Sequence, residues 1–211
     1  MKILLVAATK NEIEPFLNQP DIEVLICGVG MPATVYHLTK KLLNKKYDIV
    51  IQAGIAGSFS KKIKKGEVVM VKEDVFGDLG VEENGSFKTI FNLGFGNENN
   101  FPFSTGTLKN TLNILETGNF KKVNAVTVNK ISDDKKVKKQ LKEIFSTDIE
   151  SMEGAAFHYV CLMQKIPFIQ LRSISNKVGE RDKKKWKIKK SFNNLNKELL
   201  RLIELLNKKA I

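Results

Sequence analysis

The segment 1–57, MKILLVAATKNEIEPFLNQPDIEVLICGVGMPATVYHLTKKLLNKKYDIVIQAGIAG, decides the fold. Within it, three apolar runs of strand length are each followed by small or polar residues. Two helical stretches, 11–17 and 32–44, separate these runs, and Pro32 suits the first turn of the second helix. Alternating strands and helices predict a largely parallel sheet covered on both faces. The three runs lie at 3–8, 22–27 and 48–53.

The remainder of the chain extends this pattern without a linker, an internal repeat or a low-complexity block. Its 211 residues, 42% of them hydrophobic, suit one domain spanning 1–211. We therefore expect a three-layer α/β/α fold around a central, mostly parallel twisted sheet. Further strands are predicted at 68–76, 122–128 and 167–174, and further helices at 133–145, 152–163 and from 183 onward.

The glycine- and asparagine-rich segment 77–102 is the longest stretch for which the sequence predicts no regular structure. Loops of this length inside a domain are often functional, so we expect part of it to cover a substrate. A solvated excursion anchored by a few phenylalanines is an equal alternative.

The N-terminus and the cysteines indicate a protein that stays in the cytoplasm. The first apolar run is too short for a signal-peptide core or a membrane span. Cys27 and Cys161 are the only cysteines, and each lies in an apolar run without a CxxC spacing or a neighbouring histidine. They are predicted to be reduced core thiols rather than metal ligands.

The formal net charge of +12 raises the question of nucleic-acid binding. The lysines, however, are scattered through helical segments without interleaved aromatic residues. Arginine, the preferred reader of phosphates and guanine edges, occurs only at Arg172, Arg181 and Arg201. A nucleic-acid role is therefore disfavoured.

Polar residues follow four of the predicted strands, at the edge where doubly wound sheets bind ligands. Carboxylates, an amide and a small-residue turn suit general acid/base work on an uncharged ligand. Each feature also has a plain structural alternative, such as helix-start acids or an ordinary tight turn. The four strand ends are Thr9 to Glu12, Gly54 to Ser58, Glu150 to Glu153, and Ser175-Asn176.

The residues around two of these strand ends form a recognisable sequence motif. Ile149-Glu-Ser-Met-Glu-Gly-Ala-Ala156, followed by Leu171-Arg-Ser-Ile-Ser-Asn176, resembles the signature of the nucleoside phosphorylase and nucleosidase superfamily. Within it, the chain resembles the methylthioadenosine/S-adenosylhomocysteine nucleosidases and, more closely, the futalosine hydrolases of menaquinone biosynthesis. The segments Phe76 to Glu82 and Asn176 to Asp182 favour the latter group.

The resemblance implies a role for each site residue. Glu12 matches the carboxylate that activates the attacking water, and Met152 and Glu153 match the pair that holds the ribose. Ala56 and Gly57 match the small turn near the sugar. Asn176 matches the position that contacts N7 of the leaving purine, and Ser175, directly before it, is a further candidate for substrate binding.

Asn176 is a departure from the adenine-specific members, which carry aspartate at this position. A 6-oxopurine presents O6, an acceptor, where adenine presents an N6 donor, and a carboxylate facing O6 would leave a polar group unsatisfied at about 1–3 kcal/mol. An amide donates to O6 and accepts from a protonated N7. Asn176 therefore favours hypoxanthine, the base of futalosine.

Water is favoured over phosphate as the nucleophile. Superfamily phosphorylases commonly take phosphate-binding arginines from the first half of the chain, and here no arginine precedes Arg172. The resemblance implies no metal or organic cofactor, and a homo-oligomer, with a dimer favoured. The alternatives are a methylthioadenosine/S-adenosylhomocysteine nucleosidase, then a purine nucleoside phosphorylase, and, from another class, a non-catalytic nucleic-acid-binding protein.

Overall fold

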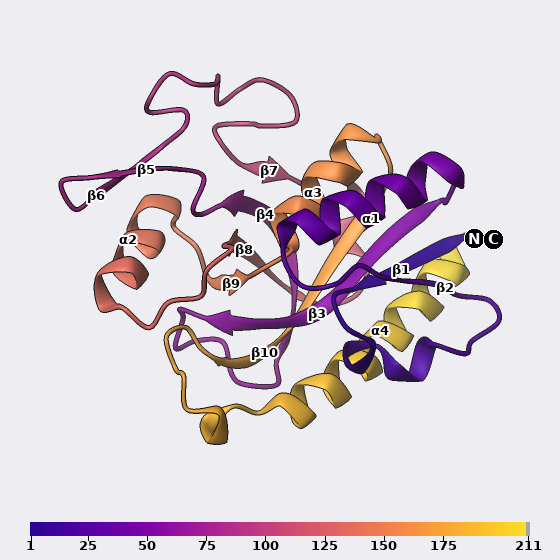
Figure 1. Cartoon of the computed structure of the whole chain (residues 1–211). Coiled ribbons are helices and arrows are strands. Elements are labelled where there is room, and N and C mark those ends of the chain that lie inside the picture. Colours follow the sequence, from indigo (N-terminus) through magenta and orange to yellow (C-terminus); the bar gives the residue numbers. More distant parts are fainter. Residues whose placement is uncertain (210–211) are drawn as a thin grey trace.

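A large mixed sheet forms the centre of the protein in the computed structural model, which describes residues 1–209 (Figure 1). Its strand order is β10-β4-β8-β9-β3-β1-β2, with β7 paired to β4. The six predicted apolar runs all form strands, and the sheet has two further short strands, β7 and β9, that were not predicted. In chain order the strands of this sheet are β1 (Ile3–Ala7), β2 (Glu23–Ile26), β3 (Ile49–Ser58), β4 (Val68–Phe76), β7 (Leu108–Lys109), β8 (Lys121–Thr127), β9 (Ile149–Ser151) and β10 (Phe168–Lys177).

Strand β3 is the organising strand of the sheet. Its first half pairs parallel with β1, and β10 runs parallel to it over nearly its whole length. Its last two residues, Gly57 and Ser58, also pair with β9. Because three strands meet at the carboxyl end of β3, residues far apart in the sequence come together there.

The α/β class is confirmed, but the sheet is mixed, because β4, β7 and β9 each have an antiparallel partner. Among residues 1–209, five pairings of the large sheet are parallel and three are antiparallel. The segment 59–67 is too short for a crossover helix, so β4 returns antiparallel to β10. Because β10 also pairs with β3, the strands β3, β10, β4, β8 and β9 close into a ring.

Helices cover both faces of the open part of the sheet (Figure 1). Helices α1 (Met31–Asn44) and α3 (Gly154–Met163) pack on one face, against Leu4 and Val6. Helix α4 (Ile188–Lys209) packs on the other, against Leu5. Both faces are buried because successive strand residues point to opposite sides. Within 1–209, no helix is long and apolar enough to cross a membrane.

Three helix predictions need correction at their boundaries. Two 3₁₀-helices, Lys10–Glu12 and Glu14–Phe16, replace the expected helix at 11–17. Pro15 is one physical reason, since it lacks the N–H that a continuous helix requires. Helix α2 (Lys135–Phe145) begins after Asp134, whose carboxylate caps it by accepting from two backbone N–H groups. The terminal helix was predicted from residue 183, but a 3₁₀-helix occupies Lys183–Lys185 and α4 begins only at Ile188. A further 3₁₀-helix, which was not predicted, lies at Asn113–Glu116.

The segment 77–102 is more regular than predicted. It contains a hairpin of β5 (Gly80–Glu83) and β6 (Ser86–Thr89), joined by Asn84-Gly85 with positive φ at both residues. Asn-Gly is the preferred pair for such a turn, and this signal was overlooked in the sequence. Beyond the hairpin, Phe91 and Phe103 stack edge to face. Coverage of a substrate by this segment stays a prediction.

Candidate active site

Glu12 lies just beyond the end of β1, and its carboxylate is fixed by three donors. Thr9 donates to Oε2 from its backbone N–H (2.9 Å) and from Oγ1 (3.1 Å), while the N–H of Ile55 donates to Oε1 (3.2 Å). The side chain is only 6% exposed. These bonds hold the carboxylate between the end of β1 and the carboxyl half of β3.

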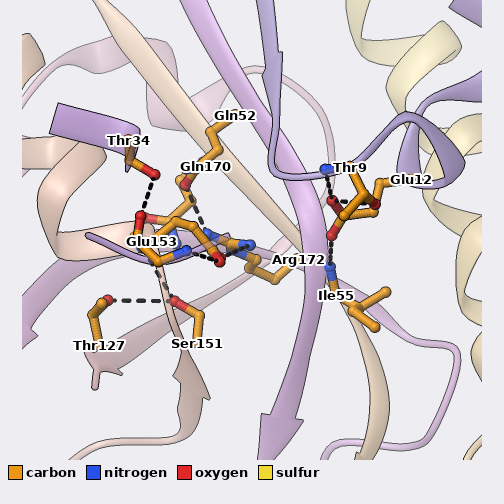
Figure 2. Close-up of polar contacts among 12 residues, drawn as sticks. Thr9, Glu12, Thr34, Gln52, Ile55, Thr127, Ser151, Glu153, Gln170 and Arg172 are labelled. Atoms are coloured by element: carbon orange, nitrogen blue, oxygen red, sulfur yellow. Dashed lines mark hydrogen bonds and ion pairs between the residues drawn. The ribbon is translucent and has the colours of Figure 1, made fainter. Parts of the chain in front are cut away.

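Arg172 supplies a buried cation beside this carboxylate. Its Nη2 donates to Oε1 of Gln52 (2.7 Å), and its Nη1 lies 3.5 Å from Oε2 of Glu153. Figure 2 shows the guanidinium between Glu153 on one side and Glu12 on the other. Burial raises the pKa of the Glu12 carboxyl above its ordinary value, and the positive charge of Arg172 offsets part of this rise.

Glu153 occupies the position immediately before α3 and links two helix starts. Its Oε1 accepts from the backbone N–H of Gly30, which precedes α1, at 3.1 Å. Its Oε2 faces Arg172, so each oxygen has a fixed neighbour. Met152, the preceding residue, is half-buried. The predicted pair thus stands at the junction of β9, α1 and α3.

Gly54 provides the space that this arrangement needs. A Cβ placed on it would collide with Nη1 of Arg172 and come within 2.9 Å of Oε1 of Glu12. The predicted Gly54-to-Gly57 turn is not a turn, because these residues continue β3. The absence of a side chain at Gly54 instead allows the side chains of Arg172 and Glu12 to approach the backbone of β3 closely.

Asn176 and Ser175 lie at the other end of this glycine-containing stretch. Ser175 Oγ donates to Oδ1 of Asn176 (2.7 Å) and lies 3.3 Å from the carbonyl oxygen of Ala56. The Nδ2 of Asn176 donates to the carbonyl oxygen of Lys177 (2.8 Å). These contacts fix which end of the amide is the donor, and one N–H and one lone pair of the amide are left for a ligand. A register irregularity in β10 at this point sets Asn176 opposite Gly57.

The structure brings the predicted residues together along the carboxyl half of β3. Glu12 and Arg172 lie at Gly54 and Ile55, whereas Ser175 and Asn176 lie at Ala56 and Gly57. Glu153 joins the group through Arg172.

Sequence reasoning missed the contribution of Arg172, although a signal was present. Arg172 interrupts the apolar run 167–174, and charged residues are almost never fully buried unless they are paired. It also missed the polar network behind Glu153. There, Thr127 Oγ1 donates to Asp74 (2.9 Å) and accepts from the N–H of Ala155 in the first turn of α3 (2.8 Å). No spacing in the sequence links these residues.

Comparison with known proteins places the chain in a family. The sequence model of the Phosphorylase superfamily matches residues 2–207 of this chain. The chain belongs to this superfamily. Among its similar members, the futalosine hydrolase of Thermus thermophilus is 28% identical over 182 residues, covering 83% of this chain and 78% of that protein. A 5′-methylthioadenosine/S-adenosylhomocysteine nucleosidase of Buchnera aphidicola is 28% identical over 192 residues, covering 82% and 71%.

A solved superfamily structure agrees with the fold. The structure of futalosine hydrolase from Helicobacter pylori superposes with a TM-score of 0.81 at 19% identity, covering 97% of each chain. At this identity the likeness supports the fold alone.

Proposed function

We propose that this chain hydrolyses the N-glycosidic bond of futalosine. Water attacks C1′ of an oxocarbenium-like ribose while the bond to the purine breaks. Glu12 takes one proton from the water, and the hydroxyl oxygen bonds to C1′ as the bond from C1′ to the purine nitrogen breaks. The leaving hypoxanthine takes up one proton from solvent, and Glu12 then releases its proton to solvent. The products are hypoxanthine and dehypoxanthinyl futalosine. The reaction is a step of menaquinone biosynthesis.

Glu12 is suited to the role of general base. Its carboxylate is oriented by Thr9 and Ile55, and burial moves its pKa toward the working pH. A base whose pKa lies nearer the working pH accepts a proton more effectively. Glu153, fixed by Gly30 and Arg172, offers oriented acceptor oxygens to ribose hydroxyls, and Met152 would contact the sugar face.

The hydrogen bonds that the Asn176 amide makes within the protein support the proposal that the base is hypoxanthine. With Oδ1 held by Ser175 and Nδ2 held by the Lys177 carbonyl, the free N–H and the free lone pair match O6 and a protonated N7. An adenine edge presents a donor at N6, which the free amide N–H cannot satisfy. This observation favours futalosine over methylthioadenosine.

Water is the preferred nucleophile because the cation nearest Glu12 is already engaged. Arg172 is 1% exposed and is held by Gln52 and Glu153. The carboxylates of Glu12 and Glu153 would both repel an incoming phosphate. A phosphorylase reaction is therefore disfavoured. The proposal also includes a homo-oligomer, most simply a dimer, as the resemblance implies. A cytoplasmic location is proposed as well, because Cys27 and Cys161 are free and buried.

A competition assay tests the proposal. Futalosine, methylthioadenosine and S-adenosylhomocysteine are mixed in one reaction, with and without phosphate, and the released bases are quantified by chromatography. We expect hypoxanthine to appear first and phosphate to have no effect. Faster adenine release would assign the chain to the alternative nucleosidases, and a ribose 1-phosphate product would make it a phosphorylase. Tight duplex-DNA binding at physiological salt without base release would indicate the nucleic-acid-binding class.

A further inference from the structure

Glu150 is a buried acid that the proposed mechanism does not use. It lies in the middle of β9 and is 5% exposed. No hydrogen bond or ion pair joins its carboxylate to another residue of the described range 1–209. Burial raises the pKa of Glu150 to about 7, although the charges of Arg181 and Lys138 act to lower it. An unpartnered buried carboxyl is costly and is usually satisfied by a ligand or water.

The strand pairing sets Glu150 on the same side of the sheet as Asn176. Gly57 lies opposite Glu150 on β9 and opposite Asn176 on β10. Directly opposed residues of neighbouring strands share a face. Ile149 and Ala56, which directly precede Glu150 and Gly57, pack with Ile174 in one apolar cluster, and alternation along a strand puts them on the opposite face from Glu150 and Gly57. Glu150 and Asn176 therefore flank Gly57 from its two sides.

Gly57 is half-buried and, having no side chain, lets Asn176 and Val178 approach the backbone of β3 closely. A Cβ at this position would lie 3.4 Å from Nδ2 of Asn176 and 3.1 Å from Cγ2 of Val178. Two strand spacings separate the backbones of Glu150 and Asn176, which is about 10 Å.

The order of polar groups on a 6-oxopurine matches two polar side chains that flank one glycine from its two sides. N7, O6 and N1–H follow one another along one edge, and the free groups of Asn176 match the first two. We propose that Glu150 accepts a hydrogen bond from N1–H of the leaving base and so selects 6-oxopurines over 6-aminopurines. Adenine presents a bare lone pair at N1, which would face the carboxylate, acceptor against acceptor. This inference rests on the proposed function and adds a second specificity-determining residue to it.

The test compares Glu150→Gln with the unmodified chain on two substrates that differ only at the base edge. These are futalosine and its analogue in which an amino group replaces O6. The glutamine keeps the size of the side chain, accepts from N1–H and, unlike the carboxylate, donates to N1 of the aminopurine. We expect the ratio of kcat/KM for futalosine over the analogue to fall at least about tenfold. Glu143→Gln, which alters an exposed carboxylate on α2, should leave the ratio unchanged.

Binding of the free bases provides a readout that does not depend on turnover. By calorimetry, the unmodified chain should bind hypoxanthine at least about tenfold more tightly than 1-methylhypoxanthine, which lacks the N1 donor, and Glu150→Leu should abolish the difference. If Glu150→Leu does not fold, Glu150→Gln still tests base choice on its own. An unchanged ratio in Glu150→Gln, with futalosine still cleaved, would overturn the role of Glu150 alone. Failure of the unmodified chain to cleave futalosine, with hypoxanthine still discriminated, would overturn the proposed reaction alone.

Discussion

Nη1 of Arg172 lies 3.5 Å from Oε2 of Glu153, and both side chains are almost fully buried. The charge of the same guanidinium also acts on the carboxyl of Glu12. One cation therefore stands between two acids for which different tasks are proposed. Glu153 is fixed by direct contact, whereas Glu12 is oriented by backbone and hydroxyl donors and keeps its capacity to accept a proton.

Replacing Glu12 by glutamine tests the proposed base. Glu12→Gln should lower kcat on futalosine at least about 100-fold, the usual scale for a general base. The fold should persist with a lower melting temperature, because the new NH2 group must face the N–H of either Thr9 or Ile55. Glu14→Gln, two residues away and exposed, is the matched control. Near-native turnover in Glu12→Gln would remove Glu12 from the mechanism.

A methyl group at Gly54 should disrupt the same site from the side of β3. Gly54→Ala forces Arg172 or Glu12 to move, because the new Cβ would occupy the space beside Nη1 and Oε1. We expect kcat/KM to fall about 100-fold, since small misplacements of catalytic groups have effects of this size. Gly96→Ala places a Cβ at 3.6 Å from the ring of Phe91, an ordinary contact, and is the control. Steady-state kinetics of the two variants provide the comparison, and equal activity would show that the close approach at Gly54 is unimportant.

Converting Asn176 to aspartate should erode the preference for futalosine. An aspartate oxygen would face the carbonyl oxygen of Lys177, now 2.8 Å from Nδ2, so burial and this contact should favour the protonated acid. The variant loses a donor to O6 whenever it ionises. The ratio of futalosine to methylthioadenosine turnover should therefore fall further as the pH rises. A ratio equal to that of the unmodified chain across pH 6 to about 9 would contradict the assignment of Asn176.

Asp74 makes a testable contribution to the pH dependence of stability. Burial raises the pKa of Asp74 to about 7 from an ordinary 3.8. A carboxyl with a raised folded-state pKa stabilises the fold at low pH, and this contribution is lost as the pH rises toward 7. The free energy of unfolding of the unmodified chain, relative to Asp74→Asn, should thus decline between pH 4 and 7 by up to about 1.4 kcal/mol per pH unit.

Denaturant titrations at several pH values measure this difference. The asparagine keeps the acceptor for Thr127, and rotation of the Gln170 amide would let its carbonyl accept from the new NH2 group. Asp21→Asn, at an exposed position, controls for loss of a surface charge. A pH-independent difference for Asp74→Asn would show that Asp74 does not titrate with a raised pKa.

The sequence predicted those candidate site residues that directly follow a strand. Glu12, Glu153 and Asn176 were predicted because polar residues directly after apolar runs meet at one edge of an α/β sheet. The antiparallel pairing of β4 with β10 was not predicted, since an apolar run reads the same in either strand direction. Glu150 was considered as a helix-start acid, but it lies within β9. Its unpartnered state depends on the pairing with Gly57, which no local pattern encodes.

The closure of the strands into a ring determines when the proposed active site can assemble during synthesis and folding of the chain. Its residues derive from positions near 12, 54–57, 150–153 and 172–176, and β3 acquires its partner β10 only when the last third of the chain is present. Contacts of such long sequence separation form late, after their loop-closure entropy has been paid. A chain emerging from the ribosome therefore gains no nucleosidase activity in stages; release of residues beyond 176 is the earliest point at which catalysis can begin.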